Sequence, residues 1–294
     1  MSIAFLGLGN MGGPMAANLV QNGEKVTGYD PDPHARDTAA GAGVSLVDSA
    51  VAAVASARIV ITMLPSGAHV LDCYREIIPA AAPGTLFLDC STIEVTDARA
   101  AADLATTGGH SALDAPVSGG VVGAAAATLT FMVGGPSEAY IAAEPYLKHM
   151  GKKIVHCGES GAGQAAKICN NMILGVSMIA VSEAFALGRG LGLTDQALFD
   201  VASTASGQCW ALTTNCPVPG PVPASPANRD YAGGFASGLM LKDLRLAQAA
   251  AHAEGIPTAL GKHAEQLYTA FVDQDGPGRD FSAIITSLTK DGPA

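Results

Sequence analysis

The glycine pattern near the N-terminus constrains the fold of this 294-residue chain more than any other feature. Gly7, Gly9 and Gly12 form G-x-G-x-x-G directly after the apolar run 3–6 and directly before a helical pattern over 11–22. Alone the pattern is weak, because 35 glycines give it many chances to occur. Between a strand and a helix it predicts a turn that places a diphosphate on the helix N-terminus.

Each glycine of the turn has its own expected role. Gly7 allows the tight turn, Gly9 lets the backbone approach a pyrophosphate, and Gly12 lets the helix pack closely against the strand. Asn10 and Met11 lie between the last two glycines and are further candidates for cofactor contact.

A carboxylate follows the second apolar run. Asp30 lies 18 residues after Gly12, where it would accept hydrogen bonds from the adenosine ribose and repel a 2′-phosphate. The pattern therefore favours NAD over NADP. Alternatively, Asp30 only opens the Asp-Pro-Asp-Pro turn, and a basic group at His34 or Arg36 could accept the phosphate instead.

The alternation of residue types changes near residue 160. Before it, short β-branched runs alternate with alanine-rich helical stretches, which predicts a mostly parallel sheet covered on both faces, with its last strands antiparallel. After it, long helical periodicities take over. We predict an α/β Rossmann-type doubly wound domain over 1–162 and an all-helical domain over 163–294, joined by a long central helix. The expected strands are Ile3–Leu6, Lys25–Tyr29, Arg58–Met63, Thr85–Asp89, Ser111–Asp114, Thr128–Val133 and Lys153–His156, and the expected later helices are 164–191, 194–205, 238–254, 258–273 and 280–289.

Two further loops belong to the predicted cofactor crevice. In a doubly wound sheet the cofactor lies outside the carboxyl ends of the strands. Leu64 and Pro65 follow the third expected long strand and Thr92 follows the fourth, so these three residues are candidate contacts.

Composition excludes several classes of partner. A formal charge of −10 argues against nucleic acid, which requires clustered Lys and Arg. The cysteines show no C-x-x-C spacing, so no metal site is expected. We expect reduced, mostly buried thiols in a cytoplasmic protein that has no signal peptide. The six are Cys73, Cys90, Cys157, Cys169, Cys209 and Cys216.

The stretch Met172–Leu187 is apolar enough to raise the question of a membrane. Glu183 interrupts it, and Lys167 and Arg189 flank it too closely for the roughly 20 apolar residues that a span needs. It is interpreted as a buried helix, apolar nearly all round, and no membrane partner is expected.

Candidate chemistry lies in the second half of the predicted sheet and in the central helix. Ser118, Gly119 and Gly120 end an apolar run, and such a turn can present N–H groups to a carboxylate, although it can also be an ordinary glycine-rich turn. Lys167 and Asn171 lie four residues apart, on one helix face. A lysine in an apolar helix either extends its amine to the surface or moves protons with a lowered pKa.

A proline- and glycine-rich stretch runs from Cys209 to Ser237. A loop of that length in a compact domain is usually functional or disordered. Trp210 at its start suggests a lid anchored by the indole ring. Lys242 opens the helical pattern directly after this stretch.

Taken together, these motifs resemble the β-hydroxyacid dehydrogenase family, and within it the members that oxidise 3-hydroxyisobutyrate with NAD in valine degradation. The resemblance spans nearly the whole chain. It is carried by FLGLGNMGGPMAANL (5–19), TMLPS (62–66), DCSTI (89–93), DAPVSGG (114–120), GAGQAAKICNNM (161–172), LMLKDL (239–244) and the loop segments around 209–220 and 231–235.

The resemblance implies roles for particular residues. Lys167 would be the general base or acid, giving methylmalonate semialdehyde, and Asn171 would orient the substrate. Ser118, Gly119 and Gly120 would hold the substrate carboxylate. Lys242 would approach both substrate and nicotinamide. A homodimer or homotetramer is also implied.

Two departures from the family pattern concern substrate preference. Asn215-Cys216 stands where relatives usually have Tyr-Asn, and 123–127 lacks the usual Arg and Gly. The alternative within the same chemistry is a reductase of tartronate semialdehyde, succinate semialdehyde or glyoxylate. From another class, a non-catalytic dinucleotide-binding protein would keep the glycine turn but would not need Lys167, Asn171 and Ser118.

Overall fold

The computed structural model describes residues 2–288. The chain forms two compact units, Met1–Lys167 and Ile168–Ala294, and the long helix α8 (Ala162–Gly190) begins in the first unit and continues into the second. The predicted domain limits of 1–162 and 163–294 stay a prediction.

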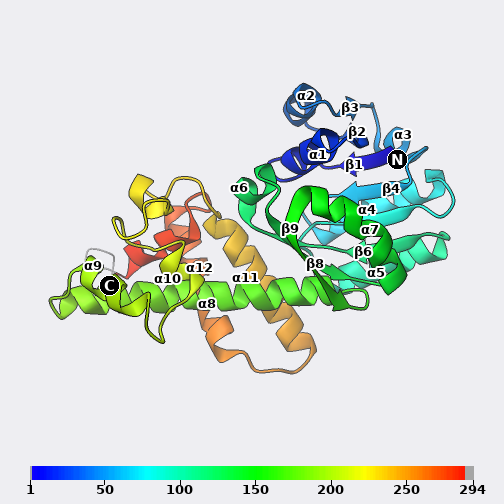
Figure 1. Cartoon of the computed structure of the whole chain (residues 1–294). Coiled ribbons are helices and arrows are strands. Elements are labelled where there is room, and N and C mark those ends of the chain that lie inside the picture. The colour runs from blue at the N-terminus through cyan, green and yellow to red at the C-terminus, as the bar shows by residue number, and fades with distance from the viewer. Residues whose placement is uncertain (1, 289–294) are drawn as a thin grey trace. The chain divides into compact units, whose positions relative to one another are not determined.

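The first unit is built on one mixed sheet, coloured blue to green in Figure 1. Six strands run parallel in the order β3-β2-β1-β4-β5-β6. This is the doubly wound order that reverses between β1 and β4, so the predicted fold class is confirmed. The strands are β1 (Ser2–Leu6), β2 (Lys25–Tyr29), β3 (Ser45–Leu46), β4 (Ile59–Thr62), β5 (Leu86–Asp89) and β6 (Ser111–Asp114).

The far edge of the sheet is only partly as predicted. β8 (Leu129–Gly134) runs antiparallel to β6 and to the short strand β7 (Val117–Ser118). In contrast, β9 (Gly151–Gly158) runs parallel to β8. The connection between them is the helix α7 (Ser137–Met150), which is long enough for the crossover that a parallel pair requires.

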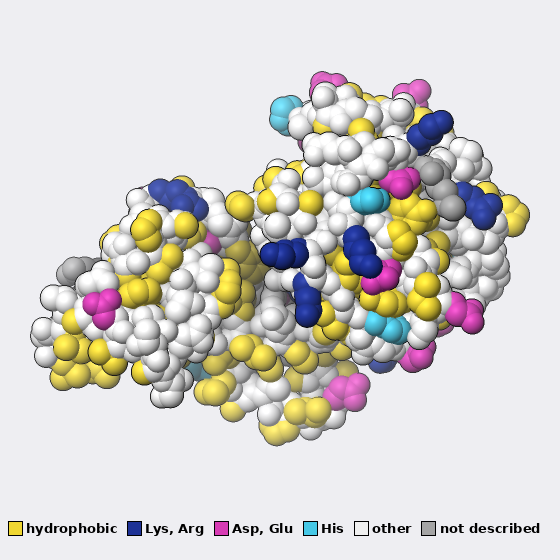
Figure 2. Space-filling model, in the orientation of Figure 1, with side chains coloured by type: hydrophobic (Ala, Val, Ile, Leu, Met, Phe, Trp, Pro, Cys, Tyr) yellow, Lys and Arg dark blue, Asp and Glu magenta, His cyan; other side chains and the backbone are white. Residues whose placement is uncertain are grey.

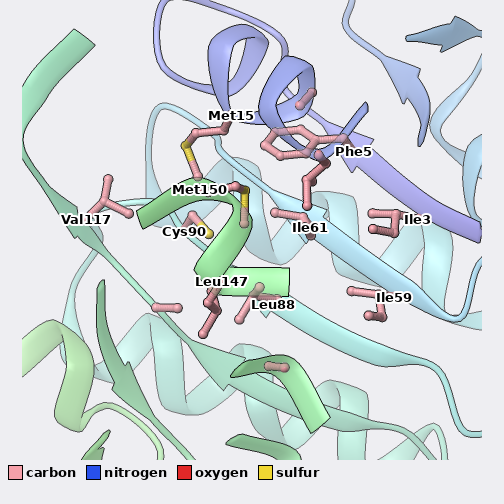
Figure 3. Close-up of a cluster of buried hydrophobic side chains, with 14 of the residues drawn as sticks. Ile3, Phe5, Met15, Ile59, Ile61, Leu88, Cys90, Val117, Leu147 and Met150 are labelled. Carbon is pink, nitrogen blue, oxygen red and sulfur yellow. The ribbon is translucent and has the colours of Figure 1, made fainter. Parts of the chain in front are cut away.

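Helices cover both faces of the sheet because successive strand residues point to opposite sides. In β1, Ile3 and Phe5 pack toward α1 (Gly12–Gln21) and α7, as Figure 3 shows. Ala4 and Leu6 pack toward the opposite helices. These are α3 (Ala50–Val54), α4 (Gly67–Ile77) and α5 (Val95–Thr107). The other helices of the unit are α2 (Pro33–Gly41), α6 (Gly120–Ala125) and the 3-10 helix η1 (Ile78–Ala80).

The second unit is helical, as predicted. Its core includes Phe185, Met240, Tyr268 and Phe281. The expected helix over 280–289 is a 3-10 helix, η3 (Phe281–Ser287), and residue 289 lies outside the described residues. The other elements are α9 (Asp195–Ala202), α10 (Trp210–Thr213), the 3-10 turn η2 (Pro226–Arg229), α11 (Ser237–Ala253) and α12 (Ala259–Asp275).

Helix α8 is less buried than its composition suggested. By length and composition alone it could cross a membrane, which is weak evidence because core helices of soluble proteins pass the same test. Met178 and Phe185 are buried, but Ile173 is 65% and Leu187 64% exposed. The expectation of a buried helix is therefore only partly met, since one part of its apolar surface is exposed.

The stretch between Cys209 and Ser237 is tied down by its own polar groups. The Asn215 side chain donates to Asp280 Oδ1 over 2.9 Å, and the Tyr231 hydroxyl donates to the Pro217 carbonyl, also over 2.9 Å. Trp210 is 51% exposed, so the prediction that it anchors the loop is wrong. The anchors are buried hydrogen bonds rather than the indole ring.

Candidate cofactor and active site

The turn after β1 has the backbone that its glycines were expected to allow. Gly7 has a φ of +91°, and a Cβ there would lie 2.3 Å from the Met63 carbonyl oxygen. A Cβ at Gly12 would lie 1.9 Å from the Gly7 oxygen, whereas one at Gly9 would meet nothing within 4 Å. A pyrophosphate can therefore approach the backbone at Gly9, whereas Gly7 and Gly12 are packed closely against other backbone atoms.

The two residues between the last glycines differ in exposure. Asn10 is exposed and Met11 is half-buried, and both directly precede the first turn of α1. In that turn Pro14 has no N–H group and the Gly13 N–H donates to the Gly9 carbonyl over 2.9 Å. A diphosphate there would therefore meet the remaining N–H groups and the positive end of the helix dipole.

Asp30 is buried beside the glycine turn. Its Oδ2 accepts the Leu8 N–H at 2.7 Å and its Oδ1 accepts the Asp32 N–H at 2.8 Å. Asp30 therefore does shape the local turn, but each carboxylate oxygen can accept more than one hydrogen bond. The structural and the cofactor-binding interpretation are compatible. His34 is exposed and Arg36 half-buried, both in α2.

The loops after β4 and β5 meet the glycine turn. The Met63 N–H donates to the Leu6 carbonyl over 2.9 Å, and the Leu64 N–H donates to Ser91 Oγ over 2.8 Å. Pro65 is exposed and Thr92 is half-buried in these loops. The unit thus brings the predicted cofactor residues of three strand ends together.

Asp89, at the end of β5, was not predicted as a site residue. It is fully buried, and Thr62 Oγ1 and Ser91 Oγ donate to its Oδ1 over 2.7 and 2.6 Å. Burial raises its pKa to about 6, although these hydrogen bonds oppose the shift. Among the described residues no hydrogen-bond partner is found for Oδ2.

The predicted carboxylate turn lies between a strand and a helix. β7 ends at Ser118, and α6 begins at Gly120. Gly119 has a φ of +135° and Gly120 of +62°, a conformation that residues with a Cβ rarely adopt. Two consecutive residues of this kind reorient the backbone N–H groups, which is compatible with binding of an anion.

Lys167 lies close to that turn. Its side chain is only 7% exposed, and Nζ donates to the Val117 carbonyl over 2.8 Å. The amine therefore does not extend to the surface. Because Val117 directly precedes Ser118, the structure brings the predicted catalytic amine next to the predicted carboxylate turn.

The first turn of α8 is bound by two polar side chains that were not predicted as site residues. Asp114 accepts the N–H groups of Gly161 and Gln164 at 2.6 and 2.9 Å. Burial raises the pKa of Asp114, although these N–H donors oppose the shift. The Gln164 side chain donates to the Ser91 carbonyl over 2.7 Å and accepts the Ile93 N–H at 3.2 Å. The signal in the sequence was a polar residue in an otherwise apolar helix start.

In the second unit, Asn171 contacts the residue that directly follows Lys242. Asn171 is 2% exposed and donates to Asp243 Oδ2, and Asp243 directly follows the half-buried Lys242 in α11. Asn171 lies one helical turn after Lys167 in α8.

Cysteines and metal ligands add no further site to the described residues. Within 2–288, no group of three or more His, Cys, Asp or Glu side chains could hold a metal ion. All six cysteines are free, but only Cys90 and Cys216 are buried and Cys169 is exposed. The expectation of mostly buried thiols is therefore wrong, since Cys73, Cys157 and Cys209 are only half-buried.

Comparison with known proteins assigns the family. A family model described as the NAD binding domain of 6-phosphogluconate dehydrogenase matches residues 2–158. One described as the NAD-binding of NADP-dependent 3-hydroxyisobutyrate dehydrogenase matches residues 161–288. A probable 3-hydroxyisobutyrate dehydrogenase of Mycobacterium tuberculosis is 57% identical over 287 residues, or 98% of this chain and 97% of its own. The chain belongs to the 3-hydroxyisobutyrate dehydrogenase family.

Other members of the 3-hydroxyisobutyrate dehydrogenase family differ in the substrate they are named for. An NAD-dependent L-serine dehydrogenase of Pseudomonas aeruginosa is 47% identical and covers 96% of both chains. The solved structure of a Mycobacterium tuberculosis 3-hydroxyisobutyrate dehydrogenase with L-serine has a TM-score of 0.95, with 57% identity and 98% coverage of both chains. The family resemblance and the dinucleotide-binding fold predicted from the sequence are thus confirmed.

Proposed function

We propose that this protein oxidises 3-hydroxyisobutyrate to methylmalonate semialdehyde with NAD, as a step of valine degradation. The observation that carries the proposal is the buried Lys167 amine, held by the Val117 carbonyl directly before the turn Ser118–Gly120. A protein that only bound a dinucleotide would have no need to bury an amine there, since burial of an ammonium group costs free energy.

The residues present fit a dinucleotide. The open space at Gly9 fits the pyrophosphate, Gly7 and Gly12 keep the turn tight, and Asp30 would accept ribose hydroxyls. Asn10, Met11, Leu64, Pro65 and Thr92 would complete the contacts. When bound, NAD accepts a hydride from the substrate carbon.

Lys167 would take the hydroxyl proton of the substrate at Nζ during oxidation and return it during reduction. A lysine amine must be neutral to accept a proton. The hydrogen bond to Val117 fixes one N–H of the amine and so limits the directions available to its lone pair.

The substrate carboxylate would bind at Ser118, Gly119 and Gly120. Asn171 would orient the substrate, and its buried hydrogen bond to Asp243 fixes the rotamer of its amide. Lys242 would add a positive charge from α11. Placement of the two reacting groups side by side supplies much of the catalysis in such reactions.

L-Serine is the second candidate substrate, because two relatives are named or titled with it. It carries the same hydroxymethyl and carboxylate groups, with an amino group in place of the methyl group. A substrate pocket that hydrogen-bonds that amino group would favour serine, and an apolar one would favour 3-hydroxyisobutyrate.

The test follows NADH or NADPH formation with (S)-3-hydroxyisobutyrate, L-serine and D-glycerate, the hydroxy acid whose oxidation gives tartronate semialdehyde, each with NAD and with NADP. We expect the highest kcat/KM with 3-hydroxyisobutyrate and NAD. Lys167→Met, which keeps the chain length without the amine, should lower kcat by about 1,000-fold, since general acid–base catalysis contributes up to about 10⁴. NADH binding should persist in this variant. Absence of turnover with every hydroxy acid, or full kcat in Lys167→Met, would contradict the proposal.

We further propose a cytoplasmic homodimer or homotetramer that binds neither nucleic acid nor membranes, on the strength of the family resemblance. Charged side chains are few and of both signs on the face drawn in Figure 2. Light scattering coupled to size exclusion would distinguish the oligomers from a monomer.

A further inference from the structure

A carboxylate from a neighbouring strand holds the start of α8. Asp114, the last residue of β6, accepts the Gly161 N–H through Oδ1 and the Gln164 N–H through Oδ2. N–H groups at the start of a helix have no partner within the helix. In a capping box, two side chains of the helix itself accept the corresponding N–H groups. Here the single buried side chain of Asp114 accepts both.

The helix touches the sheet at this point without intervening side chains. A Cβ at Gly134 would lie 2.5 Å from Asp114 Oδ1 and 2.7 Å from the Gly163 nitrogen. A Cβ at Gly163 would lie 2.3 Å from the Met132 oxygen and 2.8 Å from Asp114 Oδ2. The backbone of the first helical turn is therefore in direct contact with β6 and β8, which leaves it little room to shift.

The segment that begins at Asp114 also binds the terminal amine of the Lys167 side chain. The Val117 carbonyl, three residues after Asp114, accepts Nζ of Lys167. Gln164, one turn before Lys167, is tied to Ser91 and Ile93. The position of the amine is thus set both through the helix backbone and through its own hydrogen bond.

We propose that Asp114 is a positioning residue for catalysis: by binding the first turn of α8, it places the Lys167 amine at the turn Ser118–Gly120. Asp114 itself touches neither substrate nor cofactor in this proposal. The inference rests on the proposed role of Lys167, and its test is chosen so that the two can fail separately.

The test compares Asp114→Ala and Asp114→Asn with the unchanged protein. Alanine removes both acceptors, and displacement of a reacting group by about 1 Å can cost about 100-fold, so kcat should fall by about 100-fold. Asparagine keeps one acceptor oxygen. The kcat of Asp114→Asn should therefore lie between those of the unchanged protein and Asp114→Ala, about 10-fold below the unchanged protein. KM for NAD and Kd for NADH should stay within about threefold in both variants, because the glycine turn is unaffected.

Ser49→Ala is the matched control in the same unit. It removes the side chain that accepts the Ala52 N–H and caps α3, far from Lys167 in the chain. It should lower stability without lowering kcat. Asp114→Ala with kcat within about threefold of the unchanged protein, or a loss seen in KM instead of kcat, or an equal kcat loss in Ser49→Ala, would overturn the proposal.

Lys167→Met in the same assay separates the two proposals. If Lys167→Met is inactive and Asp114→Ala is fully active, only the positioning role fails. If Lys167→Met is fully active, or no hydroxy acid is oxidised, the proposed function fails. Amide hydrogen exchange over 161–166 tests directly, without an activity assay, whether Asp114 holds the first turn of α8. It should be at least about tenfold faster in Asp114→Ala than in Ser49→Ala, and equal rates would overturn the proposal.

Discussion

Two buried aspartates, one in each unit, hold neighbouring segments in similar ways but to different ends. Asp114 in the first unit accepts two backbone N–H groups of α8. Asp280 in the second unit is fully buried and accepts hydrogen bonds from Asn215, Phe235 and both the backbone and the hydroxyl of Ser282.

The difference lies in the element that each carboxylate holds. Asp114 holds the helix that carries Lys167, whereas Asp280 holds the proline-rich stretch and the start of η3. A buried carboxylate with a full set of donors is therefore first a structural element. Whether its loss changes kcat or only stability depends on what is attached to the bound segment.

The largest effect is expected for Asp280→Ala. It leaves buried donors of three residues without an acceptor, so the free energy of unfolding should fall by about 4 kcal/mol. Chemical denaturation measures the loss, and Asp280→Asn, which keeps one acceptor, should lose less. A loss below about 1 kcal/mol in the alanine variant would show that the network is not what holds the stretch.

Asp89 extends the comparison to a carboxylate with one oxygen that has no hydrogen-bond partner within residues 2–288. Its pKa is raised from 3.8 to about 6, so it stabilises the fold below about pH 4 and loses that contribution as the pH rises through about 6. The loss amounts to about 3 kcal/mol. Asp89→Asn should therefore gain stability relative to the unchanged protein between pH 4 and pH 7.

Denaturation of both proteins at the two pH values measures this change. Thr62 and Ser91 can still donate to the remaining side-chain oxygen in Asp89→Asn. The two proteins therefore keep the same hydrogen bonds at this position and differ in the group that titrates. A difference in unfolding free energy that stays constant with pH would contradict the raised pKa.

Asp30 is an aspartate with both a local and a proposed ligand-binding role. Asp30→Asn keeps one acceptor for the N–H groups of Leu8 and Asp32 but removes the charge that would repel a 2′-phosphate. The ratio of kcat/KM for NAD to that for NADP should fall about tenfold, which corresponds to about 1.4 kcal/mol. Arg36→Ala is the control. If it changes the ratio more than Asp30→Asn does, Arg36 rather than Asp30 governs the cofactor preference.

The smallest effect is expected at an exposed cap that holds a helix end alone. Thr194 Oγ1 accepts the Ala197 N–H at 3.1 Å at the start of α9. Thr194→Ala should lower the free energy of unfolding by about 1 kcal/mol and leave kcat unchanged. A lower kcat in Thr194→Ala would mean that loss of any helix cap disturbs turnover. A kcat loss in Asp114→Ala would then no longer indicate a specific positioning role for Asp114.

The sequence predicted most strands and the glycine turn because these depend on local patterns. β2 and β6 were predicted at their observed limits, and Gly7 and Gly12 are where the backbone leaves no room for a Cβ. Lys167 was predicted as a site residue because a lysine in an apolar helix is unusual, and its catalytic role stays a prediction. Each of these signals lies within one short segment of the chain.

What was missed depends on contacts between distant segments. Asp114 binds Gly161, 47 residues later in the chain, and no periodicity within either segment indicates that pairing. The parallel direction of β9 was missed because α7 was not recognised as a crossover helix. The anchor of the proline-rich stretch was assigned to Trp210, whereas Asn215 reaches Asp280, 65 residues away.

The direct contact between the first turn of α8 and the sheet has a mechanical consequence. That turn packs directly on β6 and β8 and is bound by Asp114, so we expect it to shift only together with them. We therefore expect any bending of the 29-residue helix to lie after this first turn. Lys167 lies within two turns of this held end, so we expect the distance between its Nζ and the Val117 carbonyl to change little when the helix bends elsewhere.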